Sequence, residues 1–366
     1  MNPYDFVPVD RDRPPQRRPY RPHNLTEGLS GRLQCRITAE SPLFIPEYKG
    51  GRAQLREVKR FLTNSEGREI IPGSSLKGLF RSLVETVGPG CWLLFGRGNC
   101  SGEYRDFEER INFDYHNKLH DAFYRCNDLK SLCPACRLFG VINGRNCSYG
   151  GNVTFSDAVC VERREHDPVY TIILSAPKPR HESWYLTGED NGNGRTVAGR
   201  KYYYHMSDIA TAGEYLPRNS DKPQNQYIKP LNTGSVFEFE ASFNNIDDDD
   251  LNLLLYALFL EPGLRHKLGN AKPAGLGSVL IEPLRLEIFD MDSRYRGGDW
   301  KRTLQGEPLT ADIRERTSVY RDDSGPAISA LRRIWQWPPL PVNFSYPGYR
   351  WFKDNPRRTM AEFNSE

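Results

Sequence analysis

The order of strand and helix patterns constrains the fold of this 366-residue chain more than any other feature. Four segments have the alternation or the apolar content of β-strands: 32–45, 152–161, 235–243 and 268–289, the last of which begins with a glycine loop that leads into the strand. Apolar residues at helical spacing follow the first and the third of these strands, in 70–85 and 245–263. With the long polar segments set aside, the order is β-α-β followed by β-α-β. This order predicts an α+β fold with a ferredoxin-like core.

The segment IIPGSSLKGLFRSLVE (70–85) leads from a strand into a helix. Its Pro-Gly pair ends the strand, and Ser74 or Ser75 is placed to cap the helix by accepting a backbone N–H. Lys77 and Arg81 are four residues apart and share a helix face. Free N–H groups and a lysine at a helix start are suited to a phosphate. These four residues are therefore candidate phosphate ligands, and a capped helix with exposed basic residues is the alternative.

Six of the eight cysteines fall between residues 91 and 147, which favours a metal site over a disulfide framework. Cys133 and Cys136 form a C-x-x-C pair that allows two thiolates to reach one tetrahedral ion, and Cys126 is near enough to be a third ligand. Four residues could supply the fourth ligand: His120 in the first place, and otherwise Cys100, Cys91 or His116. Four protein ligands leave no open position, so we predict a structural zinc ion. A redox pair and free buried thiols are the alternatives.

A glycine loop, GNAKPAGLGSV (269–279), precedes the last predicted strand. Gly275 and Gly277 permit a close backbone approach to another chain, and Lys272 adds a charge. The loop follows a helix and precedes a strand, which is the reverse of a dinucleotide-binding fingerprint. An ordinary helix-to-strand turn is the alternative to a binding loop.

The segment GRTVAGRKYYYH (194–205) combines basic and aromatic side chains. Basic groups hold phosphates and aromatic rings stack on bases, with little dependence on sequence. Four residues are the candidates here: Arg195, Arg200, Lys201 and Tyr202. An exposed tyrosine-rich hairpin is an equally good interpretation.

The overall charge identifies no partner, because 50 basic residues face 47 acidic ones. Any nucleic-acid surface must therefore come from local clustering.

Residues 1–24 are rich in proline and arginine and predict a disordered or extended arm. Residues 290–366 predict an irregular C-terminal extension packed on the core by its tryptophans. No run is apolar and long enough for a membrane span, and the start lacks a signal-like segment, so we expect a cytoplasmic protein with no membrane partner.

Taken together, IPGSSLKGLFRSLVE, CPACRLFG and AKPAGLGSV resemble the RAMP superfamily of CRISPR-associated RNA-binding proteins. More narrowly, they are similar to the backbone subunits of type III effector complexes, over about residues 32–289. The resemblance implies an RRM-type, ferredoxin-like domain at 25–289. It also implies a zinc-stapled insertion at about 89–150 and a thumb-like insertion at about 162–232.

The resemblance further implies partners and a role. A subunit of this kind binds CRISPR guide RNA, meets target RNA and assembles with other effector subunits into an antiviral ribonucleoprotein complex. The serine turn and the glycine loop would lie on the guide backbone, and the thumb would shape the guide–target duplex. Phosphate contacts position RNA without reading its sequence, which suits a guide holder.

One departure from the family pattern concerns cleavage. Target-cutting subunits carry an aspartate in the loop after the first strand, whereas here no aspartate occurs between Asp12 and Asp106. Glu47 and Glu57 are weak substitutes, because a longer side chain displaces the carboxylate. We therefore expect a subunit that does not cut RNA. The alternatives are an endoribonuclease of the same superfamily, acting on target or precursor guide RNA, and a zinc-stapled adaptor that binds only proteins.

Overall fold

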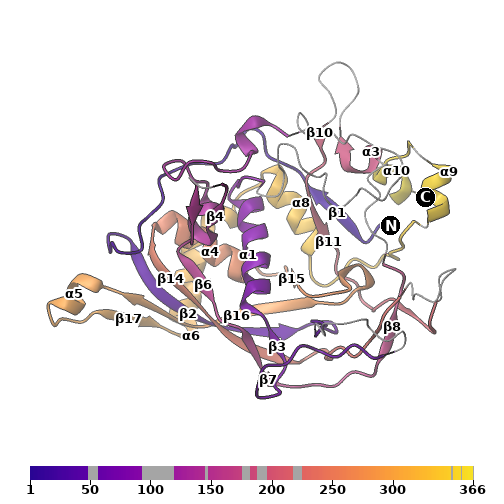
Figure 1. The fold of residues 1–366 in the computed structure, drawn as a ribbon, viewed down its shortest axis with the longest axis horizontal. Coiled ribbons are helices and arrows are strands. Elements are labelled where there is room, and N and C mark those ends of the chain that lie inside the picture. The colour runs from indigo at the N-terminus through magenta and orange to yellow at the C-terminus, as the bar shows by residue number, and fades with distance from the viewer. Residues whose placement is uncertain are drawn as a thin grey trace.

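A curled antiparallel sheet of eight strands forms the centre of the protein (Figure 1). The computed structural model describes residues 1–47, 57–92, 119–144, 147–174, 182–187, 196–216, 225–347, 349–355 and 357–365. Six strands follow one another in the order β15 (His266–Lys267), β16 (Ser278–Phe289), β2 (Leu29–Ala39), β14 (Val236–Ile246), β7 (Ala158–Glu162) and β3 (Ile70–Ile71). In addition, β17 (Lys301–Leu304) pairs with β16, and β6 (Val153–Phe155) pairs with β14.

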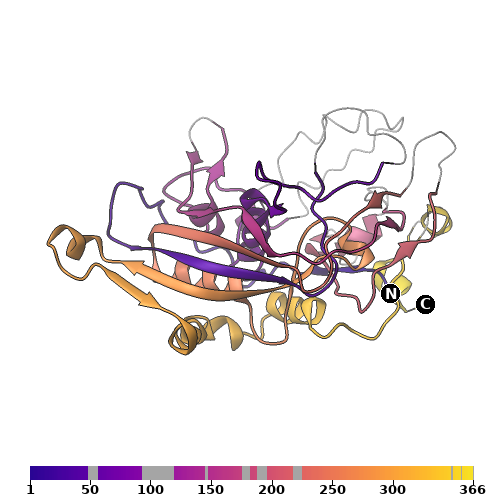
Figure 2. The same cartoon turned by 90° about the horizontal axis from the view of Figure 1, so that it is seen from below.

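Alternation along the central strands gives the sheet one buried and one exposed face. In β2 the side chains of Leu33, Cys35 and Ile37 are fully buried, whereas those of Arg32 and Arg36 are exposed. Successive side chains of a strand point to opposite faces, so this pattern turns one face to the core and the other to solvent. Figure 2 shows the same fold turned by 90°, with the long strands running across the middle and orange and yellow C-terminal helices below them.

Two helices pack on the buried face: α1 (Gly73–Val87) and α4 (Asp248–Phe259). They contact each other, and they also contact β6 and β16 respectively. Phe80 of α1 stacks on Phe155 of β6 and on Phe239 of β14, with ring centroids 5.2 and 6.2 Å away. The predicted strands and helices are therefore present in a mixed α/β fold, although β2 is shorter than predicted and the strand predicted at 152–161 is divided into β6 and β7.

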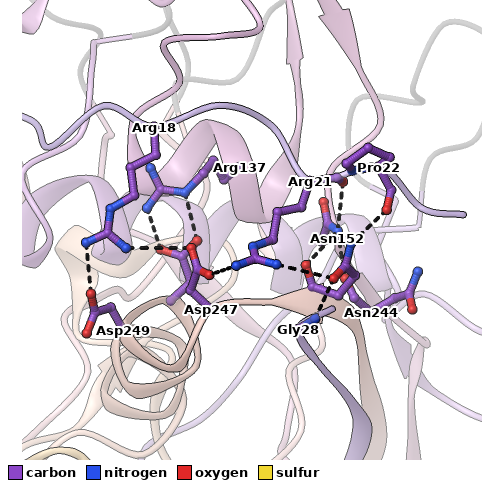
Figure 3. A network of polar contacts seen from close by, with 11 residues as sticks. Arg18, Arg21, Pro22, Gly28, Arg137, Asn152, Asn244, Asp247 and Asp249 are labelled. Carbon is purple, nitrogen blue, oxygen red and sulfur yellow. Dashed lines mark hydrogen bonds and ion pairs between the residues drawn. The ribbon is translucent and has the colours of Figure 1, made fainter. Parts of the chain in front are cut away.

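Residues 1–24, predicted as a disordered or extended arm, pack along the body of the protein in a largely extended conformation. Strand β1 (Tyr4–Val7) pairs with β11 (Arg200–Tyr203). Three arginines of the arm form ion pairs with distant carboxylates: Arg13 with Asp323, Arg18 with Asp249, and Arg21 with Asp247. The last two pairs are visible in Figure 3. The arginines that suggested a solvated tail are thus neutralised by acidic groups far along the chain.

The C-terminal segment is more helical than predicted. Its helices are α5 (Met291–Tyr295), α6 (Gly306–Arg316), α7 (Ser318–Arg321), α8 (Pro326–Trp335), α9 (Tyr349–Asp354) and α10 (Met360–Asn364). In α8 the side chains of Ile328, Leu331, Ile334 and Trp335 recur at helical spacing and are buried, so packing sets its conformation. This helix contacts β1, β11 and α1. Among the described helices, none is long and apolar enough to cross a membrane.

The two predicted insertions hold short elements. The first contains the 3-10 turn η2 (Asp121–Phe123), α2 (Pro134–Phe139), β4 (Val141–Ile142) and β5 (Ser148–Tyr149). The second contains β8 (Val169–Thr171), α3 (Glu182–Tyr185), β9 (Leu186–Thr187), β10 (Thr196–Val197), β11, β12 (Thr211–Ala212) and β13 (Tyr227–Ile228). Because β11 pairs with β1, the second insertion returns to the body of the protein beside α8 (Figure 1).

Candidate metal centre and nucleic-acid interface

Four buried cysteines form a cluster in which all sulfur atoms lie within 4.8 Å of one another: Cys91, Cys126, Cys133 and Cys136. Cys133 directly precedes α2 and Cys136 lies in its first turn, so the C-x-x-C spacing presents both thiols together. The backbone N–H of Cys133 donates to Cys126 Sγ at 3.2 Å, and that of Cys91 donates to Cys133 Sγ at 3.4 Å. Hydrogen bonds from the Cys126, Cys136 and Cys91 thiols lower the pKa of Cys133 well below its usual value. The pKa of Cys126 is lowered as well, whereas hydrogen bonds within the cluster raise the pKa of Cys91 and Cys136. Without an ion the cluster therefore favours thiolate, the form that binds metal, at two of its four cysteines.

The cluster fits one tetrahedral metal ion. Sulfurs held about 2.3 Å from a tetrahedral Zn²⁺ lie about 3.8 Å apart, and the sulfurs of Cys91 and Cys136 are 3.6 Å apart. Three of the four cysteines are the predicted ligands, and the fourth sulfur comes from the alternative Cys91 instead of a nitrogen of His120. His120 is exposed, and its Nδ1 accepts a hydrogen bond from a backbone N–H two residues on. Cys100 and His116 lie outside the described residues.

Arg81 links α1 to this cluster. Its Nε donates to Glu85 Oε1 at 2.8 Å, its Nη1 donates to the carbonyl oxygen of Gly140 at 2.7 Å, and its Nη2 lies 3.5 Å from Cys136 Sγ. The other oxygen of buried Glu85 pairs with Arg200 at 2.8 Å. Two of the predicted phosphate ligands, Arg81 and Arg200, thus share one buried carboxylate.

The exposed carboxylate of Asp157 lies at the start of α1. The helix begins at Gly73, whose N–H donates to Asp157 Oδ1 at 2.8 Å, and no side chain caps it from the preceding residue. Ser74 and Ser75 lie exposed in the first turn. The predicted serine cap is therefore wrong, because Asp157 provides the negative charge that the positive end of the helix dipole favours.

A cavity of about 540 Å³ opens between five segments that are far apart in the sequence. Its lining includes Ser75 and Ser82 of α1, Lys201, Tyr202 and Tyr203 of β11, and Lys267, Asn270 and Lys272 between α4 and β16. No carboxylate is among the described residues that line it. Parts of the serine turn, the basic aromatic segment and the glycine loop therefore meet at one cationic cavity.

Burial and mutual repulsion act on the three lysines of this cavity. Burial, together with the charge of Lys272, lowers the pKa of Lys201 to about 8 and that of Lys267 to about 7. Burial also lowers the pKa of Lys272. The ammonium of Lys267 donates to the oxygens of Gly275 and Ser278, each at 3.0 Å. A bound anion would offset both effects by adding an opposite charge, so the cavity favours an anionic ligand.

Gly275 and Gly277 shape the loop instead of lining the cavity. Both have positive φ, 93° and 83°. A Cβ on Gly277 would lie 1.8 Å from the backbone oxygen of Leu268, and one on Gly275 would lie 2.9 Å from that of Asp208. Both glycines are required by the close approach of the chain to itself, and the loop they form presents Lys272.

Strand alternation divides the residues of β11. Lys201 lies 3.5 Å from the ring centroid of Tyr4 and shares its strand face with Tyr203. Tyr202 lies at the cavity wall but is buried, and its hydroxyl donates to the carbonyl oxygen of Ser82 at 3.1 Å. The half-buried ring of Tyr203 is therefore better placed than that of Tyr202 to stack on a base. Lys267 was not among the residues predicted from the sequence. Only its position shortly before the glycine loop could have indicated it.

The remaining predicted site residues lie outside the cavity lining. Lys77 is half-buried on α1, where burial and the charge of Arg81 lower its pKa. Glu47 is half-exposed and Glu57 exposed, and neither lines the cavity. Arg195 lies outside the described residues.

Comparison with known proteins gives the family. The model of the RAMP superfamily matches residues 36–280, which is more than half of the chain. No curated protein matches. Among solved structures, a chain described as "Crystal structure of Csm3-Csm4 subcomplex in the type III-A CRISPR-Cas interference complex" is 16% identical, with a TM-score of 0.35. The match covers 81% of this chain and 99% of that one. On the match to the family model, this chain belongs to the RAMP superfamily.

Proposed function

We propose that this protein is a guide-RNA-binding subunit of a type III-like CRISPR effector complex, and that it holds RNA at the lysine-lined cavity without cutting it. The observation that carries the proposal is the convergence of Lys201, Lys267 and Lys272 on one cavity whose described lining has no carboxylate. Membership of a superfamily of CRISPR-associated RNA-binding proteins supports the same function.

The chemistry of the cavity suits an RNA backbone. Lysines in a partly desolvated site attract phosphate more strongly than lysines in open water, because the local dielectric is lower. Tyr203 offers a ring on which any base can stack, and Ser75 and Asn270 offer hydrogen bonds to phosphate or ribose. None of these contacts reads a particular base, which suits a subunit whose specificity comes from guide–target pairing.

The strand order supports the finer assignment of a ferredoxin-like core. Counted along the chain, the four core strands are β2, then β6 with β7, then β14 and finally β16. In the sheet they lie in the order fourth, first, third, second. With α1 and α4 packed on one face, this is the arrangement we propose for a split β-α-β domain.

We propose that the four cysteines hold a structural zinc ion. Four thiolates around one ion leave no position for substrate, so its chemistry is confined to tying segments together. The cluster joins the end of α1, through Cys91, to the start of α2, through Cys133 and Cys136.

RNA binding by the purified protein tests the RNA part of the proposal. The variant Lys201→Ala/Lys272→Ala is compared with Lys59→Ala/Lys130→Ala, which removes two exposed lysines outside the cavity. We expect each lost lysine to weaken binding by about 10- to 100-fold, since a hydrogen bond to a charged group contributes about 1.5–3 kcal/mol. The slope of log affinity against log salt should fall by about 1.4 for a single strand.

The control and the integrity of the RNA decide the interpretation. Equal weakening by the two double variants would place RNA binding elsewhere. A lysine with a lowered pKa can act as a general base, so the RNA must also be examined for cuts. Cleavage that Lys201→Ala abolishes, in a preparation free of other nucleases, would favour the endoribonuclease alternative.

A further inference from the structure

Arg17, in the N-terminal arm, contacts the cysteine cluster directly. Its Nη1 donates to Cys126 Sγ at 2.8 Å, and its Nη2 donates to the carbonyl oxygens of Ala122 and Tyr124 at 2.9 and 2.8 Å. The other arm arginines with ion pairs bind carboxylates instead. Among the arm arginines with these contacts, Arg17 differs because its guanidinium binds a cysteine sulfur.

The charge of a metal-loaded cluster explains why a guanidinium lies there. One divalent cation bound by four thiolates leaves about two negative charges uncompensated. Arg17 approaches Cys126 from the arm, and Arg81 approaches Cys136 from α1. A thiolate is a strong acceptor and a neutral thiol a weak one, so these contacts gain strength in the loaded, anionic cluster.

The surrounding backbone ties the arm to the loop that carries the cluster. Arg18 and Leu132 exchange two backbone hydrogen bonds at 2.9 and 2.8 Å, and the N–H of Tyr20 donates to the carbonyl oxygen of Leu129 at 2.8 Å. The guanidinium of Arg137, in α2, donates to the carbonyl oxygen of Gln16 at 3.3 Å. The arm therefore lies against the segment between Cys126 and Cys133, whose shape a bound ion would set.

We propose that Arg17 is a positioning residue of the metal centre, and that it couples metal occupancy to docking of the N-terminal arm. The loaded cluster holds the arm through Arg17, and by linkage the docked arm retains the metal. This inference rests on the proposed metal centre and is independent of RNA binding.

Metal retention and hydrogen exchange test the coupling. Arg17→Ala is compared with Arg18→Ala, its neighbour, which pairs with Asp249 and removes the same charge from the same arm. We expect Arg17→Ala to lose zinc to a chromogenic chelator about 10- to 100-fold faster, the range for loss of groups that support metal ligands. Arg18→Ala should stay close to the native rate. The amides of residues 18 and 20 should lose protection in Arg17→Ala, while those of β2 and β14 keep theirs.

Each outcome is decisive. Native zinc retention and native arm protection in Arg17→Ala would overturn the coupling while leaving the metal centre in place. Equally faster loss in both variants would show that the effect comes from the charge of the arm in general, which overturns the specific role of Arg17. A purified native protein with no bound zinc, and no uptake of added zinc, would overturn the metal centre itself and the inference with it.

Discussion

Replacing Glu85 with glutamine removes a buried carboxylate that serves two guanidinium groups. Glu85 pairs with Arg81 and Arg200, each at 2.8 Å, and the three side chains expose only 7%, 16% and 17% of their surface. The neutral amide keeps the shape but leaves two partly buried cations without their anion. Loss of one partner from a buried ion pair typically costs about 3–5 kcal/mol. Since the arginines keep some solvent contact, we expect the free energy of unfolding to fall by about 3 kcal/mol, at the lower end of that range.

Equilibrium urea unfolding, followed by circular dichroism, measures this loss. The matched control is Glu66→Gln, which removes a carboxylate from an exposed pair with Arg68 and should cost about 0–1 kcal/mol. Zinc content, measured on the folded variant, should fall as well, because Arg81 also contacts Cys136. If Glu85→Gln costs no more than Glu66→Gln, the carboxylate is not the centre of this network and the reasoning is refuted.

Three further predictions concern the cavity, the cluster and the glycine loop. The pKa of Lys267 is lowered to about 7 and that of Lys201 to about 8 in the free protein, and a bound phosphate would raise both. RNA affinity should therefore fall as the pH rises above about 7, and each lysine contributes up to about tenfold per pH unit above its own pKa. In binding titrations, Lys201→Arg should remove the part of this fall that begins at about pH 8. Cys91→Ser should lower the zinc content measured by mass spectrometry, and His120→Ala should leave it unchanged, whereas the reverse would restore histidine as the fourth ligand. Gly277→Ala should lower the free energy of unfolding by more than about 2 kcal/mol, since its Cβ meets a backbone oxygen at 1.8 Å; Gly144→Ala, also at positive φ but with open space, should cost less.

Local patterns were sufficient for the core elements. The alternation in 235–243 and the aspartates at the start of 245–263 specified β14 and α4, because both signals lie within one element. The C-x-x-C spacing identified two cysteines of the cluster for the same reason. Alternation within β11 could also have predicted that Lys201 points to the opposite strand face from Arg200 and Tyr202, but the four candidates were treated as one group.

Long-range pairing was beyond the same reasoning. Arg200 looks like an exposed cation in the sequence, because nothing local shows that it pairs with Glu85, which lies far away in the chain. The pair of Arg81 with Glu85 is four residues apart on one helix, so spacing alone could have indicated it. The serine cap of α1 was predicted wrongly for a reason similar to that for Arg200, since Asp157, which accepts the N–H of Gly73, lies 84 residues away in the sequence. Cys91 lies far before Cys126 in the sequence, and spacing alone does not show that the chain returns to the cluster. His120 is nearer to Cys126 and was therefore predicted as the first choice for the fourth ligand.

The cluster and the cavity share one polar connection, and this suggests why an RNA-binding subunit would carry a structural metal. Arg200 donates from Nη2 to the carbonyl oxygen of Cys91 at 3.1 Å while its other nitrogen pairs with Glu85. The next residue along β11 is Lys201, which faces the cavity. A metal ion that fixed Cys91 would therefore also fix β11, the strand that presents Lys201 to the cavity. A lysine side chain that is already held in place loses little conformational entropy when it binds a phosphate. We therefore infer that the metal centre affects RNA affinity by fixing the position of β11, and not by contacting RNA. On this reasoning, Glu85→Gln should weaken RNA binding even though Glu85 does not line the cavity, and unchanged binding in a folded Glu85→Gln protein would separate the two sites.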